Sequence, residues 1–463
     1  MKYLALMLAI LLLLPIGEST SNEGIYDLLI VAPHKFLKAL EPLVEHKIRH
    51  GIRTKLVSIE EVYEQMFWYG RDKAEKLKYF IKFAHEIWGI KYVLLVGGRK
   101  GQGIREDYWI PVRYSHLSRG YDTGKSYMRE SKFLTDLYYA DLYDQEGKFS
   151  SWDDNSNCIF GEWPENAKAI DRPDLHPDVY VGRLPCRNVR EVKIVVRKII
   201  EYENGEHTNS SWFKRFVVVA GDTYPNKTDY YDGEVYTQKG IEYMEGFEPV
   251  RLWASKGTLR GWIDVVREIN KGCGFIWFSG HGNPASWVTH PPNSDKWITG
   301  LKLWHMIFLR NDGKLPVCIS GSGCFNNMFN VSIWHSEWVY FMGLIHYNIP
   351  RCWGWSLVRN PHGGSIATIA ATAFSYESPD IKSREGGIEW LDMHFFEQYG
   401  RRGITTLGEA WGRTIDAFLE NFTINWDDTS RNGSALIAKN VEEWLLIGDP
   451  SLRIGGYCKP EKS

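Results

Sequence analysis

The fold of this chain is decided by two stretches, Gly274-Phe-Ile-Trp-Phe-Ser-Gly-His-Gly282 and Leu315-Pro-Val-Cys-Ile-Ser-Gly-Ser-Gly-Cys324. In each stretch, a run of apolar residues ends in a glycine-rich turn, a pattern that predicts a buried strand followed by a loop. Comparable runs alternate with helical patterns along most of the chain, which is typical of parallel sheets with helices on both faces. We therefore predict an α/β protein with mainly parallel sheets.

The alternation of strand and helix patterns occurs twice. The first series ends with a helical pattern at 189–203, and a polar segment at 204–211 separates it from the second series, which starts at 216–220. This predicts two adjacent subdomains, and helical patterns near the end, the last of them at 435–446, predict a helical C-terminal end. In chain order we expect a signal peptide (1–21), a first α/β subdomain with a long aromatic and acidic loop region (22–204), a second α/β subdomain (205–455) and a tail (456–463).

The amino terminus has the pattern of a secretory signal. Lys2 precedes an apolar run at residues 3–16, and small and polar residues follow at 17–21, as in signal peptides. The run is shorter than the about 20 residues that a membrane-spanning helix needs, although an uncleaved anchor is the structural alternative. No second long apolar run occurs. We therefore expect no integral membrane segment in the mature chain, and a protein that is secreted, extracellular or at the cell surface, after cleavage.

Composition excludes several classes of protein. The 463 residues carry 55 lysines and arginines against 57 aspartates and glutamates, a net charge of −2. A general nucleic-acid binder carries a marked basic excess, so we expect no nucleic-acid partner. The seven cysteines are scattered without a C-x-x-C pair, which argues against a disulfide scaffold and against structural zinc.

A histidine and a cysteine follow the two strands quoted above. In open parallel sheets, ligands bind beyond the carboxyl ends of the strands, so His281 and Cys324 lie where a base and a nucleophile can meet. The amides of Gly282 and Cys324 could then stabilise an oxyanion during acyl transfer. The plainer interpretation is a simple G-H-G turn and a cysteine that serves as a small buried hydrophobe, as we expect for Cys318 within its apolar strand.

These stretches resemble the gingipain-type cysteine peptidases, which have a caspase-like fold. The resemblance extends in order from about residue 25 to 455. It includes Tyr26-Asp-Leu-Leu-Ile-Val-Ala-Pro33, Asp136-Leu-Tyr-Tyr-Ala-Asp141, Asp178-Val-Tyr-Val-Gly-Arg-Leu-Pro185, Gly363-Gly-Ser-Ile-Ala-Thr-Ile-Ala-Ala371 and Gly448-Asp-Pro-Ser-Leu452. Two departures are an additional small residue before Cys324 and a Trp- and Pro-rich insertion around 287–304, between the histidine and the cysteine.

The resemblance implies two adjacent caspase-like subdomains, of which 205–455 is the catalytic one. It implies a secreted cysteine endopeptidase that cleaves a protein or peptide substrate. Cys324 would be the nucleophile, His281 the general base and acid, and a thioester the acyl-enzyme. No cofactor is required by this chemistry, no long pro-segment is expected before the first subdomain, and the oligomeric state is not indicated.

An S1 pocket is also implied, and its residues are harder to place. A pocket for Arg or Lys needs an acidic residue, because a buried cation must be paired. Asp136, Asp141 and Asp144 lie where such a residue could come from. Thr372 and Phe374, which follow the strand pattern at 364–372, are candidates for the pocket wall, with packing at the end of a strand as the alternative.

The loop region of the first subdomain contains a cluster of oxygen ligands. Asp141, Asp144 and Asp153 lie in a segment rich in carboxylates and amides around Gly147, and calcium favours such groups. The spacing does not match an EF-hand loop. We consider a structural calcium ion at these three residues, with a solvated acidic turn as the alternative.

Other functions are less consistent with the sequence. No G-x-S-x-G elbow occurs in the chain, which argues against a serine hydrolase, and no carboxylate pair of a glycoside hydrolase can be located. The main alternative is a catalytically degenerate peptidase fold that acts as a secreted peptide- or glycan-binding protein. The 20 Trp and 25 Tyr residues would suit binding through stacking.

Overall fold

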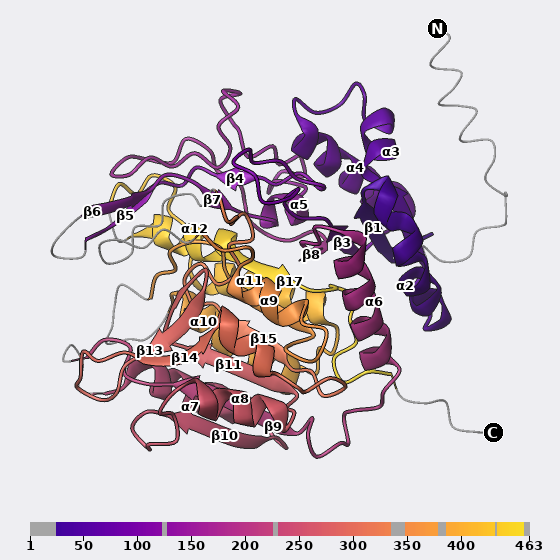
Figure 1. Ribbon diagram of the computed structural model, residues 1–463. Coiled ribbons are helices and arrows are strands. Elements are labelled where there is room, and N and C mark those ends of the chain that lie inside the picture. Colours follow the sequence, from indigo (N-terminus) through magenta and orange to yellow (C-terminus); the bar gives the residue numbers. More distant parts are fainter. Residues whose placement is uncertain are drawn as a thin grey trace, which may run out of the picture.

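The computed structural model describes residues 25–122, 127–225, 230–334, 348–377, 386–430 and 433–457. The predicted signal peptide at 1–21 lies outside the described residues, and so does most of the predicted tail at 456–463. Helices cover the faces of one large central sheet (Figure 1).

The central sheet has ten strands in the order β10-β9-β11-β15-β16-β17-β8-β3-β1-β2. Their bounds, in chain order, are β1 Leu28–Ala32, β2 Thr54–Ser58, β3 Tyr92–Val96, β8 Tyr180–Leu184, β9 Arg215–Ala220, β10 Glu248–Trp253, β11 Phe275–Ser279, β15 Val317–Ser320, β16 Ala367–Ala371 and β17 Trp444–Ile447. All neighbouring strands are parallel except β16 and β17.

The two predicted subdomains therefore contribute to a single sheet. Strands β1, β2, β3 and β8 come from the first, and they join the strands of the second through the parallel pairing of Ile447 with Arg183. Because β17 is antiparallel to β16, the strands of the first half run opposite to those of the second. The carboxyl ends of β9, β11, β15 and β16 consequently lie together at one edge.

Helices and 3-10 helices cover both faces of the sheet. Their bounds are η1 His34–Phe36, α2 Leu37–Arg49, α3 Ile59–Gln65, α4 Lys73–Trp88, α5 Leu137–Ala140, α6 Val189–Glu203, α7 Asp232–Tyr243, α8 Trp262–Asn270, η2 Leu303–Phe308, α9 Trp353–Val358, α10 Ile388–Gly400, α11 Leu407–Asn421 and α12 Ser434–Glu443. These results confirm an α/β protein with a mainly parallel sheet and a helical C-terminal end.

Strand β11 shows why both faces need cover. Side chains alternate between the two faces of a strand, and all five residues of β11 are buried. Trp277 packs on Phe396 of α10, with ring centroids 5.2 Å apart, whereas the next residue, Phe278, packs on Trp353 of α9 at 5.1 Å. The continuous apolar run in the sequence thus reflects burial on both faces.

One helix differs from the sequence-based expectation, and one insertion forms strands for which the sequence analysis made no prediction. The predicted helix at 435–446 ends at Glu443, and the following apolar run forms β17 because it pairs with β16 and β8. The insertion around 287–304 forms part of a small antiparallel sheet of β12 His281–Asn283, β13 Ser286–Thr289 and β14 Ile298–Lys302. His281 is the first residue of β12 in this small sheet.

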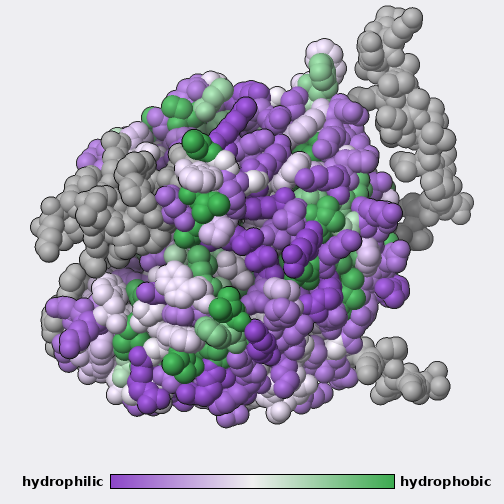
Figure 2. All heavy atoms as spheres, in the orientation of Figure 1, coloured by the Kyte–Doolittle hydropathy of each residue, from purple (hydrophilic) through white to green (hydrophobic). Residues whose placement is uncertain are grey.

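The surface is mainly polar. The face shown in Figure 2 is largely hydrophilic, with its apolar side chains in small groups. Among the described residues, none of the helices combines the length and the apolar character needed to cross a membrane.

Candidate active site

His281 and Cys324 lie on neighbouring loops at the same edge of the sheet. Strands β11 and β15 pair in parallel, and the two residues follow the ends of these strands by two and four positions, respectively. The two loops touch, since a Cβ atom on Gly282 would lie only 2.5 Å from the carbonyl carbon of Gly323. Glycine at 282 therefore permits the backbone of the histidine segment to lie against that of the cysteine loop.

The orientation of His281 is set by a backbone carbonyl. Its Nε2 atom lies 2.8 Å from the carbonyl oxygen of Thr223, which follows β9. Since a carbonyl oxygen only accepts hydrogen bonds, Nε2 must carry a proton in this contact. Nδ1 is then the nitrogen whose protonation can change during a reaction. The ring is half-buried, and the rings of Tyr224 and Trp297 meet it edge-on, each at 5.5 Å.

The Cys324 thiol is half-buried and lies beside the loop after β16. Its Sγ atom is 3.2 Å from Oγ of Ser375. Burial raises the pKa of the Cys324 thiol to about 11, despite the opposing hydrogen bonds from Ser375. Glu443 raises this pKa further, and Lys439 lowers it. At neutral pH the thiol in this conformation is therefore protonated, and a nucleophilic attack needs a base to remove its proton.

The two amides expected to bind an oxyanion belong to Gly282 and Cys324. The amide of Cys324 donates to the carbonyl oxygen of Ser322 at 3.1 Å, so it is engaged within its own loop in this conformation. Gly282 lies in β12, opposite Trp287 of β13. A role for the Cys324 amide in oxyanion binding requires the Ser322 contact to open.

A buried carboxylate supports the loop that carries Cys324. Asp392 of α10 is fully buried and accepts hydrogen bonds from the amides of Gly321, at 2.8 Å, and Ser322, at 3.3 Å. The indole nitrogens of Trp277 and Trp444 also donate to it, at 3.2 and 3.0 Å. Burial raises the pKa of Asp392 to about 7, while these donors lower it. The carboxylate thus anchors the start of the loop to the core.

Three acidic residues lie together, and one of them, Glu377, interacts with the thiol. Glu377 follows Ser375 by two residues and interacts electrostatically with Cys324, Asp232 and Glu389. A Cβ atom on Gly233 would lie 2.7 Å from the carbonyl oxygen of Ser279, which places the start of α7, and Asp232 with it, against the end of β11. We call Asp232, Glu377 and Glu389 the acidic cluster.

Two members of the acidic cluster, Glu377 and Glu389, have raised pKa values. Burial raises the pKa of Glu389 to about 8, and burial with the neighbouring acids raises that of Glu377 well above its usual range. A hydrogen bond links these two side chains, and Glu389 Oε2 has no hydrogen-bond partner among the described residues. Within the described part of the chain, no lysine or arginine forms an ion pair with Glu377 or Glu389.

The expected pocket residues divide into two groups. Phe374 packs on Phe325, the residue after the cysteine, with ring centroids 4.6 Å apart, so it lies beside the Cys324 loop. Thr372 is buried and donates to the carbonyl oxygen of Leu134 at 2.6 Å, as expected for packing at the end of a strand. Asp136 differs from the expectation of a pocket acid, because Arg183 binds both of its carboxylate oxygens, at 2.6 and 2.8 Å.

Asp141 also has partners within the first half of the chain. It is fully buried and accepts hydrogen bonds from Trp152 Nε1 at 2.6 Å and Ser150 Oγ at 3.2 Å. Burial raises the pKa of Asp141 to about 7, against the lowering effect of Lys78. Asp144 closes a turn by accepting from the amides of Glu146 and Lys148. Among the residues that the structure describes, neither carboxylate has a hydrogen-bond partner in the loops around Cys324.

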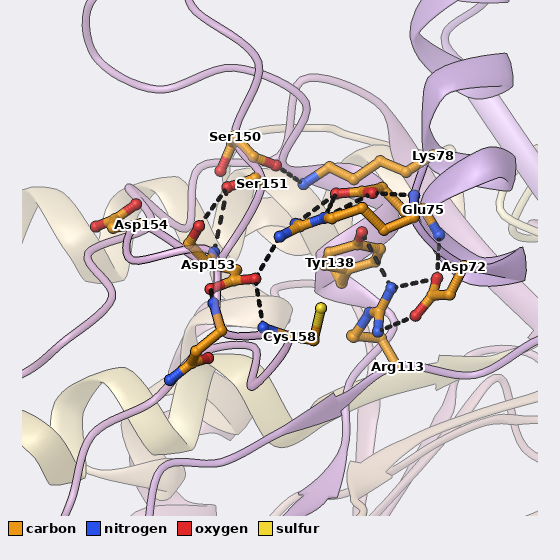
Figure 3. A network of polar contacts seen from close by, with 12 residues as sticks. Asp72, Glu75, Lys78, Arg113, Tyr138, Ser150, Ser151, Asp153, Asp154 and Cys158 are labelled. Carbon is orange, nitrogen blue, oxygen red and sulfur yellow. Dashed lines mark hydrogen bonds and ion pairs between the residues drawn. The ribbon is translucent and has the colours of Figure 1, made fainter. Parts of the chain in front are cut away.

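The three residues considered for calcium have separate partners. Asp153 forms an ion pair with Arg71 and accepts from the amides of Asn157 and Cys158. Figure 3 shows this network, in which Asp153 is surrounded by protein donors. Among the described residues, no group of three His, Cys, Asp or Glu side chains is arranged to hold a metal ion. Calcium stays a prediction that this arrangement does not favour.

Comparison with known proteins places this geometry in a family. The chain matches Peptidase family C25 over residues 21–455. It belongs to that family. Family C25 is a family of cysteine peptidases, which agrees with the sequence resemblance and with the cysteine at the edge of the sheet.

Individual relatives are distant. Gingipain R2 of Porphyromonas gingivalis strain W83 is 19% identical over 445 residues, which cover 95% of this chain and 47% of that protein. Gingipain R1 of P. gingivalis is 18% identical, covering 95% of this chain and 35% of that protein. The chain thus spans about half or less of the length of the curated relatives that it matches.

Solved structures share the fold. The complex of the pro- and mature domains of P. gingivalis RgpB matches with a TM-score of 0.61 and 17% identity, covering 92% of this chain and 79% of that one. The Arg-specific cysteine proteinase gingipain R matches with a TM-score of 0.60 and 17% identity, covering 95% and 80%. These matches confirm the caspase-like fold.

Sequence reasoning missed several residues of the site. Thr223 could have been found, because it follows a predicted strand at the same edge. Ser375 and Glu377 lie just past the two residues that were considered for the pocket wall. Asp392 and Glu389 gave no signal beyond helical spacing, since nothing in the sequence shows which loop a distant helix will face.

Proposed function

We propose that this protein is a cysteine endopeptidase in which Cys324 and His281 form the catalytic dyad. The main support is the contact between the two loops that follow β11 and β15, because it brings a thiol and an imidazole to one edge of the sheet in a C25 family member. The position of His281 Nε2 on a backbone carbonyl supports a role for Nδ1 in proton transfer.

In the proposed first step, Cys324 Sγ bonds to the carbonyl carbon of the scissile peptide. The raised pKa of the thiol keeps its proton in place until attack. During the attack, this proton passes to Nδ1 of His281. The imidazolium then protonates the leaving nitrogen, and the carbon–nitrogen bond breaks. The product is a thioester, and the amine fragment departs with the thiol proton.

The second step returns the enzyme to its starting state. Water adds to the thioester carbon and gives a proton to His281, and the carbon–sulfur bond breaks as the thiol regains its proton. The amides of Gly282 and Cys324 would stabilise the oxyanion in both steps. Binding of the substrate carbonyl would replace the contact between the Cys324 amide and Ser322.

For the P1 position we propose a basic side chain. The acidic cluster of Asp232, Glu377 and Glu389 supports this, because Glu377 interacts electrostatically with Cys324 and neither Glu377 nor Glu389 has a lysine or arginine partner among the described residues. A cation entering the cluster would stabilise the ionised carboxylates. A structurally similar protein, gingipain R, is described as Arg-specific.

We also propose that the protein is exported. The support is the apolar run at residues 3–16 after Lys2, which has the length and flanks of a signal peptide. Amino-terminal sequencing of the protein recovered from the medium or cell surface of its host would identify the cleavage point, and an intact Met1 in that fraction would contradict cleavage.

The test of the function is hydrolysis of a P1-varied fluorogenic peptide library by the purified protein under reducing conditions. We expect hydrolysis by the wild type and none by Cys324→Ala. Cys158→Ala is the matched control, because Cys158 is exposed and lies in the first half. Activity that survives in Cys324→Ala would overturn the mechanism, and silence of the folded wild type would favour the degenerate binding protein.

A further inference from the structure

Asn326, two residues after the cysteine, connects the two loops of the site. It is fully buried. Its Nδ2 atom donates to the carbonyl oxygens of Asn283, at 2.8 Å, and Ser286, at 3.2 Å. Its Oδ1 atom accepts from Oγ of Ser320, at 3.0 Å, at the end of β15. One side chain therefore bonds to the histidine segment and to the strand that leads to Cys324.

The orientation of this amide follows from its partners. Both carbonyl oxygens can only accept, so the group that faces them must be the NH₂ group of Asn326. The oxygen is then directed at Ser320, whose hydroxyl can donate. These contacts need a side chain that donates through one end and accepts through the other, which an amide does. A carboxylate of the same shape could not donate to Asn283.

We propose that Asn326 is a positioning residue, which holds the β12 segment with His281 at a fixed distance from the Cys324 loop. This inference rests on the proposed function of the dyad. The contact between Gly282 and Gly323 limits how closely the two loops approach, and the Asn326 bonds prevent them from separating. A displacement of about 1 Å between reacting groups can lower a rate about 100-fold.

The next residue, Asn327, offers a matched control. It has the same side chain and is also fully buried. Its Nδ2 atom donates to the carbonyl oxygens of Thr368, at 3.1 Å, and Leu445, at 2.9 Å, which lie in β16 and β17. Asn327 thus makes the same kind of double donation within the scaffold, without bonding to the histidine segment.

The first experiment compares Asn326→Asp with Asn327→Asp in the intact chain. Both changes place a carboxylate against two carbonyl oxygens. We expect Asn326→Asp to lower kcat about 100-fold with little change in KM. Both variants should lower the melting temperature by a similar amount, but Asn327→Asp should not show that loss of kcat. Equal kcat values for the two folded variants would overturn the proposal.

A second experiment measures the coupling between His281 and Cys324 without peptidase activity. The rate of Cys324 alkylation by iodoacetamide is followed by mass spectrometry across pH, in a Cys158→Ala background. We expect His281→Ala to change this rate in the wild type and in Asn327→Asp, but much less in Asn326→Asp. The same change in all three backgrounds would overturn the proposal, as would no change in any of them.

Failure of the inference and of the function can be told apart. An active wild type with full kcat in Asn326→Asp overturns the positioning role alone. If the wild type is inactive but shows the His281–Cys324 coupling, and Asn326→Asp loses that coupling, the peptidase function alone is overturned. If Asn326→Asp does not fold, Ser320→Ala replaces it, because it removes only the hydroxyl that bonds to Asn326, and we expect a smaller loss of kcat in the same direction.

Discussion

Two acidic regions of the molecule are built in opposite ways. In the first half of the chain, two carboxylates are paired with cations: Asp153 with Arg71, and Asp72 with both terminal nitrogens of Arg113 at 2.9 Å (Figure 3). In the second half, the acidic cluster beside Cys324 consists of acids that face one another. Its member Glu389 is 2% exposed.

The comparison indicates two uses of a carboxylate. A carboxylate paired with a cation maintains the fold, whereas one without a cation partner is available to a charged substrate. A paired carboxylate has its field neutralised and its hydrogen-bonding capacity used, so a ligand gains little from it. Glu377 and Glu389, which lack a cation as partner among the described residues, have raised pKa values and keep their protons instead. A cation that displaces those protons would meet at least two carboxylates at once.

The largest expected effect is on stability, from breaking a pair in the first half. Asp136→Ala would leave Arg183, which is fully buried, without the carboxylate that binds it through two hydrogen bonds. We expect a loss of about 3–5 kcal/mol in the free energy of unfolding, measured by urea denaturation. If the variant folds, its ranking of P1 residues should match that of the wild type.

The ranking of P1 residues in this variant tests the contrast between the two acidic regions. Asp136 was an expected pocket acid on sequence grounds, and the structure assigns its charge to Arg183. A folded Asp136→Ala variant that loses its preference for basic P1 residues would show that this paired carboxylate contributes to substrate binding after all.

A smaller effect is expected on activity, from changing the acidic cluster. Glu377→Gln with Glu389→Gln should lower kcat/KM for peptides with Arg at P1 by about 100-fold, since a desolvated cation loses its charged partners. Peptides with an apolar P1 residue should be affected much less. The free energy of unfolding should not fall, because the wild-type side chains are protonated acids whose burial already disfavours their charge. An equal loss for both peptides would contradict a specificity role.

The sequence was sufficient for the residues that follow strands but not for those that support them. The placement of His281 and Cys324 just after neighbouring strands could be predicted, because two apolar runs end in glycine-rich turns. Asp392 could not, because its contact with the Cys324 loop depends on how α10 packs on the sheet. The reversal at β17 was missed for a related reason, since a short apolar run after a helix has no periodicity of its own.

The acidic cluster shows a further limit of sequence reasoning. The sequence offers Asp136, Asp141 and Asp144 as pocket acids because they lie in a segment rich in acids, yet all three have partners within the first half. Whether a carboxylate is paired depends on distant residues, such as Arg183 for Asp136. Local composition therefore indicates where acids are frequent, and only the fold shows which of them lie beside a cation.

The smallest expected effect is the pH dependence of the preference for a basic P1 residue. The pKa of Glu389 is raised from 4.5 to about 8, so the folded protein holds a proton there that the unfolded chain releases. Its contribution to stability is therefore present below about pH 4.5 and is lost as the pH rises through about 8. Binding of a cation has the opposite dependence, because it requires the ionised form.

The ratio of kcat/KM for Arg to that for citrulline at P1 isolates this effect, because citrulline has nearly the same shape without the charge and shares the ionisations of Cys324 and His281. We expect the ratio to rise about tenfold between about pH 6 and pH 8, and to be flat in Glu377→Gln with Glu389→Gln. In Asp136→Asn, a change in the paired region, the rise should persist. A ratio that is flat in the wild type would mean that the acidic cluster is ionised throughout or does not contact the P1 side chain, and the contrast between the two acidic regions would then concern the fold alone.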